Sequence, residues 1–266
     1  MKTSTPFCIA GMHRSGTSLI AGWMYSSGIF FGHSLLKAAS SNPKGHFEDE
    51  EFLEFHSKIL EREGFHRSGL TIEHNNFEFN SNEYEIAKAI IQDRMNMELW
   101  SWKEPRTTLF LNSYKQLIPN LKIIGIYRKP ELVIDSLYKR LKKNKWYYTR
   151  NPIKKLEWYL DIDLKKSKWV KTFSKTYALY NEKLLNIKND APDEVLLFDI
   201  DVLISNPEIF EKKVNELLAL DLNLIPFEDF YEEKYISKKT DNINFIPDEN
   251  AQLSYSELQK LSDLKV

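Results

Sequence analysis

The chain has 266 residues, 42% of them hydrophobic and 28% charged, which suits one large α/β domain with a sizeable buried core. Acidic and basic residues nearly cancel to a net charge of −1, so no overall field favours nucleic acid or an anionic membrane as a partner. The single cysteine, Cys8, excludes an intramolecular disulfide, and none of the six histidines has zinc-site spacing, so we expect a reducing compartment and no metal.

The amino terminus carries only a short apolar stretch before Gly11, which is too short for a signal peptide. No later run approaches the length of a membrane span, so we expect a cytoplasmic protein without one.

Short apolar runs bounded by turn residues predict buried strands, and longer stretches with apolar residues at helical spacing predict helices. The predicted strands are residues 7–10, 99–102, 121–127 and 195–198. The predicted helices are residues 17–27, 49–62, 84–97, a helix opened by Pro130, 154–187 and 207–220. Strands alternating with helices predict an α/β fold: a parallel sheet flanked by helices on both faces, as a single domain over residues 1–266.

The segment after the first strand, residues 10–18, reads AGMHRSGTS and opens a helix. A glycine-bounded turn at this place aims successive backbone N–H groups and a helix N-terminus at one point, which makes an anion site. The spacing G-x-x-x-x-G matches a phosphate loop, but Thr17 stands where nucleoside triphosphatases have lysine, and Arg14 supplies the positive charge instead. A tight strand-to-helix turn without a ligand is the alternative.

The run GMHRSGTSLI resembles the 5′-phosphosulfate-binding loop of the sulfotransferase superfamily that uses 3′-phosphoadenosine 5′-phosphosulfate (PAPS), in particular its bacterial and Golgi-type members. The resemblance implies a phosphate-loop-type fold and a PAPS co-substrate without a required metal. It also implies donor-binding roles for Arg14, Ser15, Gly16, Thr17 and Ser18.

A second signature of this superfamily is matched by residues 121–140, where a predicted strand ends in Arg128 and a helix carries Ser136 eight residues later. An arginine at the carboxyl end of a strand and a serine on the following helix can bind one phosphate together, and the resemblance implies that this is the 3′-phosphate of the donor. Arg140 lies one helical turn beyond Ser136, and an arginine at this offset contacts the nucleotide in tyrosylprotein sulfotransferases. A surface arginine is the alternative for Arg140.

Sulfuryl transfer needs a base near the acceptor hydroxyl and positive charge where the leaving phosphate gains electrons. The segment GHFEDEE at residues 45–51 resembles a G-x-[FY]-E segment of the superfamily, and we predict Glu48 as the base, oriented by backbone N–H groups at a helix start. His46 is the reserve base, and Glu50 ranks third; plain helix-capping acids are the alternative.

The segment WKEPRT at residues 102–107 resembles the K-D-P segment of the superfamily, so the resemblance implies that Lys103 stabilises the departing oxygen. Glu104 could orient Lys103 or act as a base, and Arg106 could line the anion site. An ion-paired turn before a helix starting at Thr107 is the alternative for Glu104 and Arg106.

We expect residues 144–190 to form a helical acceptor-side segment and the acceptor to be a hydroxyl of a saccharide or glycolipid, as for a bacterial cytosolic enzyme. Core packing is the alternative for its aromatic residues, which include Trp146, Tyr147, Tyr148, Trp158 and Trp169. Two other functions stay open: a phosphate-loop kinase of a small molecule and a non-catalytic PAPS-binding module.

Overall fold

A parallel sheet of four strands forms the centre of the computed structural model, which describes residues 5–36, 45–143, 153, 156, 164–232 and 243–264. The strands are β1 (Thr5–Ala10), β2 (Leu99–Lys103), β3 (Lys122–Tyr127) and β4 (Val195–Asp199). Their order across the sheet is β2-β1-β3-β4, so β1 pairs with β2 on one side and β3 on the other. The four predicted strands and their parallel arrangement are therefore confirmed.

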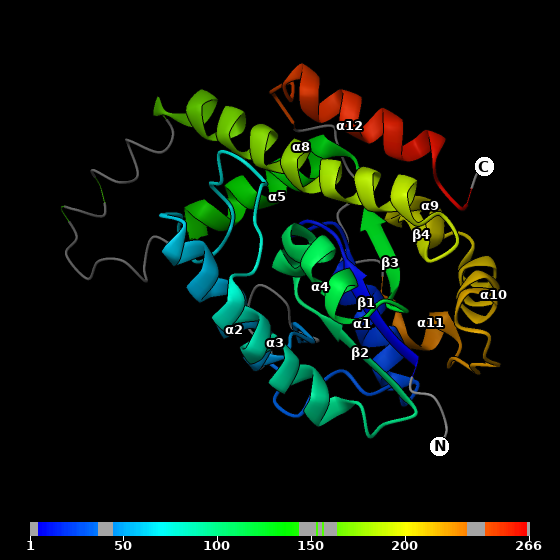
Figure 1. Ribbon diagram of the computed structural model, residues 1–266. Helices are drawn as coiled ribbons and strands as arrows, with labels where there is room; N and C mark the ends of the chain where they lie inside the picture. The colour runs from blue at the N-terminus through cyan, green and yellow to red at the C-terminus, as the bar shows by residue number, and fades with distance from the viewer. Residues whose placement is uncertain are drawn as a thin grey trace.

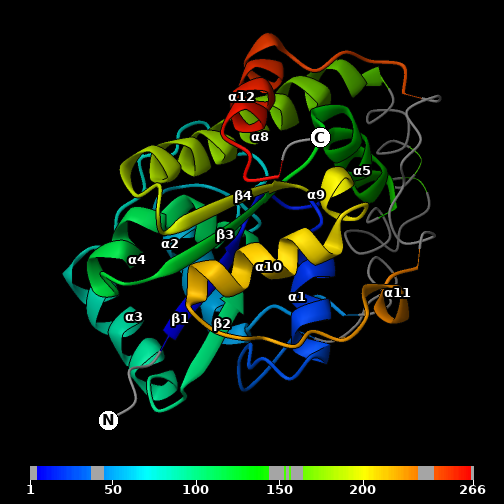
Figure 2. The same ribbon diagram turned by 90° about the vertical axis from the view of Figure 1, so that its right-hand side faces the viewer.

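Helices join the strands and cover both faces of the sheet. They are α1 (Thr17–Ser26), α2 (Glu50–Arg62), α3 (Ser81–Arg94), the 3₁₀ helix η1 (Pro105–Phe110), α4 (Leu111–Leu117), α5 (Pro130–Lys143), α8 (Lys166–Asp190), α9 (Ile200–Leu203), α10 (Pro207–Leu218), α11 (Phe227–Phe230) and α12 (Glu249–Lys260). In Figure 1, α8 and α12 lie side by side along the top of the molecule. Figure 2 shows α10 and α1 on the other side of the sheet.

The core has two parts because side chains along each strand alternate between the two faces. In β1, Cys8 and Ala10 belong to the cluster that includes residues of α2, α4, α5 and α8. Phe7 and Ile9 belong to the second cluster, which includes residues of α1, α10 and α11. Because both faces are covered, the strands are apolar over nearly their whole length, as is typical of parallel sheets.

Some helix boundaries differ from the prediction for local reasons. Helix α3 begins at Ser81, earlier than expected, because Asn80 and Glu83 form a capping box that fixes the first turn. The predicted helix at Thr107 is a 3₁₀ helix that begins at Pro105 and continues into α4. Helix α12 follows the cap residue Asp248 and was not predicted. Most of the expected segment 144–190 before α8 lies outside the described residues.

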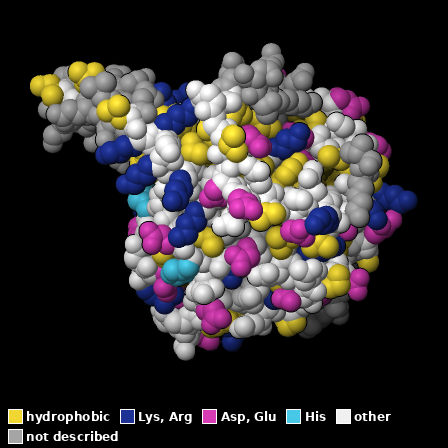
Figure 3. Space-filling view, turned by 90° about the horizontal axis from the view of Figure 1, so that it is seen from above, with side chains coloured by type: hydrophobic (Ala, Val, Ile, Leu, Met, Phe, Trp, Pro, Cys, Tyr) yellow, Lys and Arg dark blue, Asp and Glu magenta, His cyan; other side chains and the backbone are white. Residues whose placement is uncertain are grey.

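The described surface carries charges of both signs. Figure 3 shows the molecule of Figure 1 from above, with Lys and Arg side chains gathered along its left edge. Elsewhere on that face, acidic and basic side chains are interspersed. Within the described ranges, no helix combines the length and apolar character needed to cross a membrane.

Candidate functional site

The residues predicted from the two signatures meet at one edge of the sheet. The strands run parallel, so the segments that follow β1, β2 and β3 all leave the sheet at its carboxyl edge. The glycine-bounded loop follows β1, Lys103 is the last residue of β2, and Arg128 comes directly after β3. The topology therefore brings together residues that lie far apart in the sequence.

The loop after β1 depends on its two glycines. Gly11 has φ 146° and Gly16 has φ 95°, and a Cβ on Gly11 would lie 2.2 Å from the backbone oxygen of Ile126. A Cβ on Gly16 would lie 2.5 Å from the side chain of Ile200. Between them Arg14 adopts φ 70°, a left-handed conformation that is uncommon for a residue with a side chain. The loop is thus held in a tight turn that opens α1.

Three arginines come together at this loop: Arg14 within it, Arg128 directly after β3 and Arg140 on α5. The Arg14 Nε atom donates a hydrogen bond of 2.8 Å to Ser136 Oγ on α5, which joins the two predicted signatures directly. Burial, and then the positive charges of Arg140 and Arg128, lower the pKa of Arg14. Asp201 Oδ1 lies 3.6 Å from Arg128 Nη2 and forms an ion pair with it. Guanidinium groups gathered in this way favour the binding of an anion.

Lys103 connects the loop, the end of β2 and the segment before α2. Its side chain is 0% exposed, and its Nζ atom donates to Glu48 Oε1 at 2.8 Å and to Ser18 Oγ at 2.9 Å. The Glu48 side chain is 9% exposed, so the ion pair is almost completely removed from water. The structure thus brings together the two residues predicted for catalysis.

Glu48 is oriented differently from the prediction. Asp49 is the cap residue of α2 and accepts the hydrogen bond from the Glu51 N–H at 3.0 Å, so Glu48 precedes the helix and its carboxylate is bound by Lys103 instead. The backbone of Glu48 is held by Leu36, whose N–H donates to the Glu48 carbonyl at 2.7 Å. Phe47, just before it, has φ 52°, a left-handed conformation that bends the chain at this point.

The reserve base His46 lies at the same site. It is half-buried, and burial is the main reason that its pKa is lowered; the charge of Glu48 opposes this effect, whereas Lys103 adds to it. His46 is therefore neutral near pH 7.

The other candidate base, Glu104, lies in a buried network behind Lys103. Its Oε1 atom accepts from Arg106 Nε at 2.7 Å, and its Oε2 atom pairs with His56 Nδ1 at 2.6 Å. Burial opposes ionisation, but Arg106 and His56 outweigh it and lower the pKa of Glu104 to about 2. His56 also bonds the Tyr114 hydroxyl at 2.8 Å. Both oxygens of Glu104 are thus bonded, and its ion pair with Arg106 fits the alternative of an ion-paired turn for these two residues.

Two polar atoms of the loop are buried without a hydrogen-bond partner among the described residues. They are Ser15 Oγ and His13 Nε2. The His13 ring packs against Tyr180 of α8, whose buried hydroxyl also has no hydrogen-bond partner among the described residues. Buried polar groups are nearly always paired, so these three atoms are candidates to bind a polar group of a ligand. Sequence reasoning did not single out His13 or Tyr180; for His13, its place inside the loop was the available signal.

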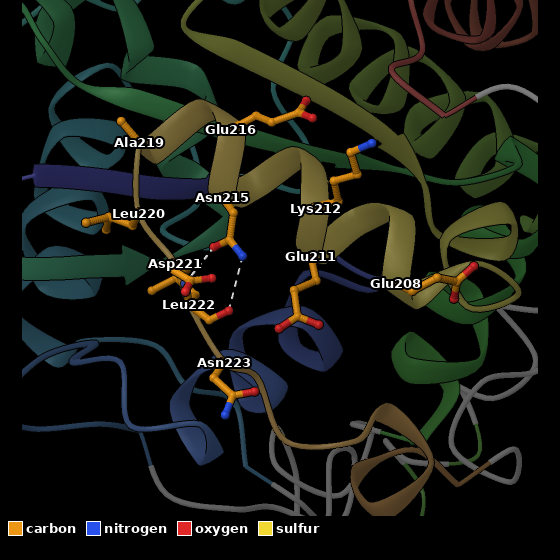
Figure 4. A pocket seen from close by; sticks show the side chains of 10 residues that line it. All are labelled: Glu208, Glu211, Lys212, Asn215, Glu216, Ala219, Leu220, Asp221, Leu222 and Asn223. Atoms are coloured by element: carbon orange, nitrogen blue, oxygen red, sulfur yellow. Dashed lines mark hydrogen bonds between the residues drawn. The ribbon is translucent and has the colours of Figure 1, made fainter.

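A hollow on the surface beside α10 is separate from this site (Figure 4). Its lining consists of Glu208, Glu211, Lys212, Asn215, Glu216, Ala219, Leu220, Asp221, Leu222 and Asn223. Asn215 spans it by bonding both the N–H and the carbonyl of Leu222. None of the predicted site residues lines the hollow, and its acidic lining does not suit an anion.

The arrangement at the carboxyl edge has two chemical capacities. The loop and the three arginines can bind an anion with more than one charged group, and Glu48 can accept a proton beside the ammonium of Lys103. In the part of the chain that the structure describes, no group of three or more His, Cys, Asp or Glu side chains is placed to hold a metal ion.

No protein-family model matches the chain, and no curated protein sequence matches it significantly. Solved structures do match. The sulfotransferase domain of the Synechococcus PCC 7002 olefin synthase is 14% identical, with a TM-score of 0.54 over 96% of this chain and 95% of that one. The sulfotransferase domain from the curacin biosynthetic pathway is 15% identical, with a TM-score of 0.54 over 99% and 100% of the two chains. A sulfotransferase from Mycobacterium avium is 13% identical, with a TM-score of 0.57 over 100% of this chain and 79% of that one. The chain therefore has the fold of these sulfotransferases.

Proposed function

We propose that the chain is a sulfotransferase that moves a sulfuryl group from PAPS to an acceptor hydroxyl. The observation that carries the proposal is the hydrogen bond from Arg14 to Ser136, with Arg128 and Arg140 nearby, because it joins the two anion-binding signatures into one site. The shared fold supports the proposal, although a fold by itself does not determine a reaction.

The residues present fit a donor with two separate anionic groups. In the proposed complex, the loop N–H groups, Arg14 and the unpartnered Ser15 hydroxyl bind the 5′-phosphosulfate. Arg128, Ser136 and Arg140 bind the 3′-phosphate from the β3 and α5 side. Thr17 and Ser18, in the first turn of α1, complete the cradle of the phosphosulfate.

The proposed reaction is an in-line displacement at sulfur. Glu48 takes the proton of the acceptor hydroxyl as its oxygen forms a bond to sulfur. The bond between sulfur and the bridging oxygen breaks, and its electron pair leaves with the phosphate of 3′-phosphoadenosine 5′-phosphate. Lys103 stabilises that charge, and its position between Ser18 on the donor side and Glu48 on the acceptor side supports this role.

A saccharide or glycolipid remains the proposed class of acceptor, and the cytoplasm the proposed compartment. Most aromatic residues that we expected to line the acceptor lie outside the described residues, namely Trp146, Tyr147, Tyr148 and Trp158. The ring centroids of Trp169 and Phe173 lie 5.7 Å apart, and Trp169 packs against the core, which fits the alternative of core packing.

Calorimetry with 3′-phosphoadenosine 5′-phosphate and with AMP tests donor recognition. We expect the 3′-phosphate to strengthen binding about ten- to a hundredfold, because a hydrogen bond to a charged group contributes about 1.5–3 kcal/mol. Labelled PAPS, incubated with saccharides, glycolipids, phenols and peptides, then identifies the acceptor. Equal affinity for the two nucleotides, or turnover of ATP with Mg²⁺ in place of PAPS, would contradict the proposal.

The variants Glu48→Gln and His46→Gln test the identity of the base. Glutamine keeps the shape of Glu48 but cannot accept a proton, so turnover should fall about 10²- to 10⁴-fold with donor affinity retained. His46→Gln should be mild by comparison. An inactive His46 variant beside an active Glu48 variant would move the assignment to the histidine.

A further inference from the structure

His13 and Arg14 are neighbours in the loop, yet their side chains face different walls of the site. Arg14 reaches α5, where it bonds Ser136. His13 packs on Tyr180 of α8, with 6.3 Å between ring centroids and an angle of 67° between the ring planes. The charged groups that act on His13 include Lys103 and Glu104 at the end of β2, so His13 lies near the residue proposed to stabilise the departing oxygen.

His13 ends in a buried atom that has no partner among the described residues. That atom is Nε2, and the Tyr180 hydroxyl next to this ring is equally unpaired. A Cβ on Gly69 would lie 2.7 Å from the Tyr180 oxygen, so the backbone at Gly69 packs directly against this hydroxyl. Leaving a buried polar group unpaired is unfavourable, and a bound hydroxyl would remove this cost.

His13 is also held in the uncharged form. Burial is the main cause, and the positive charges of Arg106, Arg140 and Lys103 act in the same direction, while Glu104 opposes them. Together they keep the pKa of His13 well below its usual range. The imidazole is therefore neutral, and in its Nε2–H tautomer it offers an N–H donor at a site otherwise rich in cations.

We propose that His13 positions the acceptor: its Nε2–H donates a hydrogen bond to the oxygen of the hydroxyl that attacks sulfur. This inference rests on the proposed sulfuryl transfer. The attacking oxygen has one proton and two lone pairs. Glu48 receives the proton, one lone pair forms the bond to sulfur, and the other accepts from His13.

The neutral state of His13 suits this role. An imidazolium would donate a stronger hydrogen bond, which would make the attacking oxygen less nucleophilic. A neutral imidazole orients the same oxygen and lowers its nucleophilicity less. Holding the oxygen in line with the bond that breaks contributes to the rate through orientation. Tyr180 keeps the ring in place through their contact.

The test compares His13→Leu with His13→Gln, because glutamine restores a neutral N–H near the position of Nε2 and leucine does not. The probe reactions are release of labelled sulfate from PAPS to water and transfer to 4-nitrophenol. We expect His13→Leu to slow both about tenfold and His13→Gln to recover most of the rate. Affinity for 3′-phosphoadenosine 5′-phosphate and the pH profile should not change in either variant.

His74→Leu is the matched control, since this histidine is exposed and far along the chain from the loop. A wild-type rate in His13→Leu would overturn the proposal. So would a glutamine variant as slow as the leucine variant, which would indicate that His13 accepts a proton. A lowered melting temperature that explains the lost rate would make the role structural. Failure of the proposed function itself is distinct, because the wild-type protein would then not bind 3′-phosphoadenosine 5′-phosphate.

Discussion

Replacing Lys103 by methionine removes an ammonium group that is 0% exposed and bonded to two side chains, while keeping most of the side-chain volume. At the 2.8 Å that separates Nζ from Glu48 Oε1, two unit charges attract by about 6 kcal/mol with an effective dielectric constant of about 20. Desolvation offsets part of this attraction. Removing one partner nevertheless leaves the other charge buried, and such changes typically cost about 3–5 kcal/mol of stability.

The double variant Lys103→Met with Glu48→Gln separates stability from catalysis. With both charges removed, no buried charge is left unpaired, so we expect the free energy of unfolding to return to within about 1–2 kcal/mol of the wild-type value. Turnover should stay at the level of the less active single variant, because neither the proton acceptor nor the charge near the leaving oxygen has been restored.

Urea titrations of the four proteins give the coupling free energy, and single-turnover rates with labelled PAPS give the chemical step. Additive losses of stability would refute the idea that the two side chains form one buried pair. Recovery of turnover in the double variant would refute the roles proposed for both residues.

Three further outcomes are expected. Arg128→Ala should weaken binding of 3′-phosphoadenosine 5′-phosphate about ten- to a hundredfold in calorimetry while changing AMP affinity little; an equal loss for both nucleotides would argue against a contact with the 3′-phosphate. The pKa of Glu104 is lowered from 4.5 to about 2 in the folded protein, so between pH 4.5 and about pH 2 the unfolded chain binds a proton that the folded protein does not. The free energy of unfolding should therefore fall as the pH drops through this range. Glu104→Gln should be less stable at pH 7 and lack that acid-dependent loss, as measured by urea titration at several pH values. Gly16→Ala should abolish nucleotide binding, because a Cβ there meets Ile200 at 2.5 Å and the residue needs φ 95°; retained binding would show that the loop can rearrange.

Much of the fold could be predicted from the sequence because its signals are local. Apolar runs such as residues 121–127 and helix starts such as Pro130 depend on neighbouring residues only, and both are observed where they were expected. The alternation of strands and helices then implied a parallel sheet, whose carboxyl edge is where the loop, Lys103 and Arg128 meet. The exact ends of the helices could not be predicted in the same way, because a cap residue such as Asn80 acts through a specific side-chain hydrogen bond.

The partners of the site residues were decided only by the tertiary structure. Arg14 and Ser136 are separated by 122 positions, and Lys103 and Glu48 by 55, so no local pattern could pair them. The same holds for Glu104, which is bonded by His56 of α2. It also holds for His13, whose contact with Tyr180 exists because α8 packs on that face of the sheet. By itself the sequence determined which chemical groups stand at the strand ends; the packing of distant helices decided which of them are paired, buried or left open, because hydrogen bonds and burial depend on position in space.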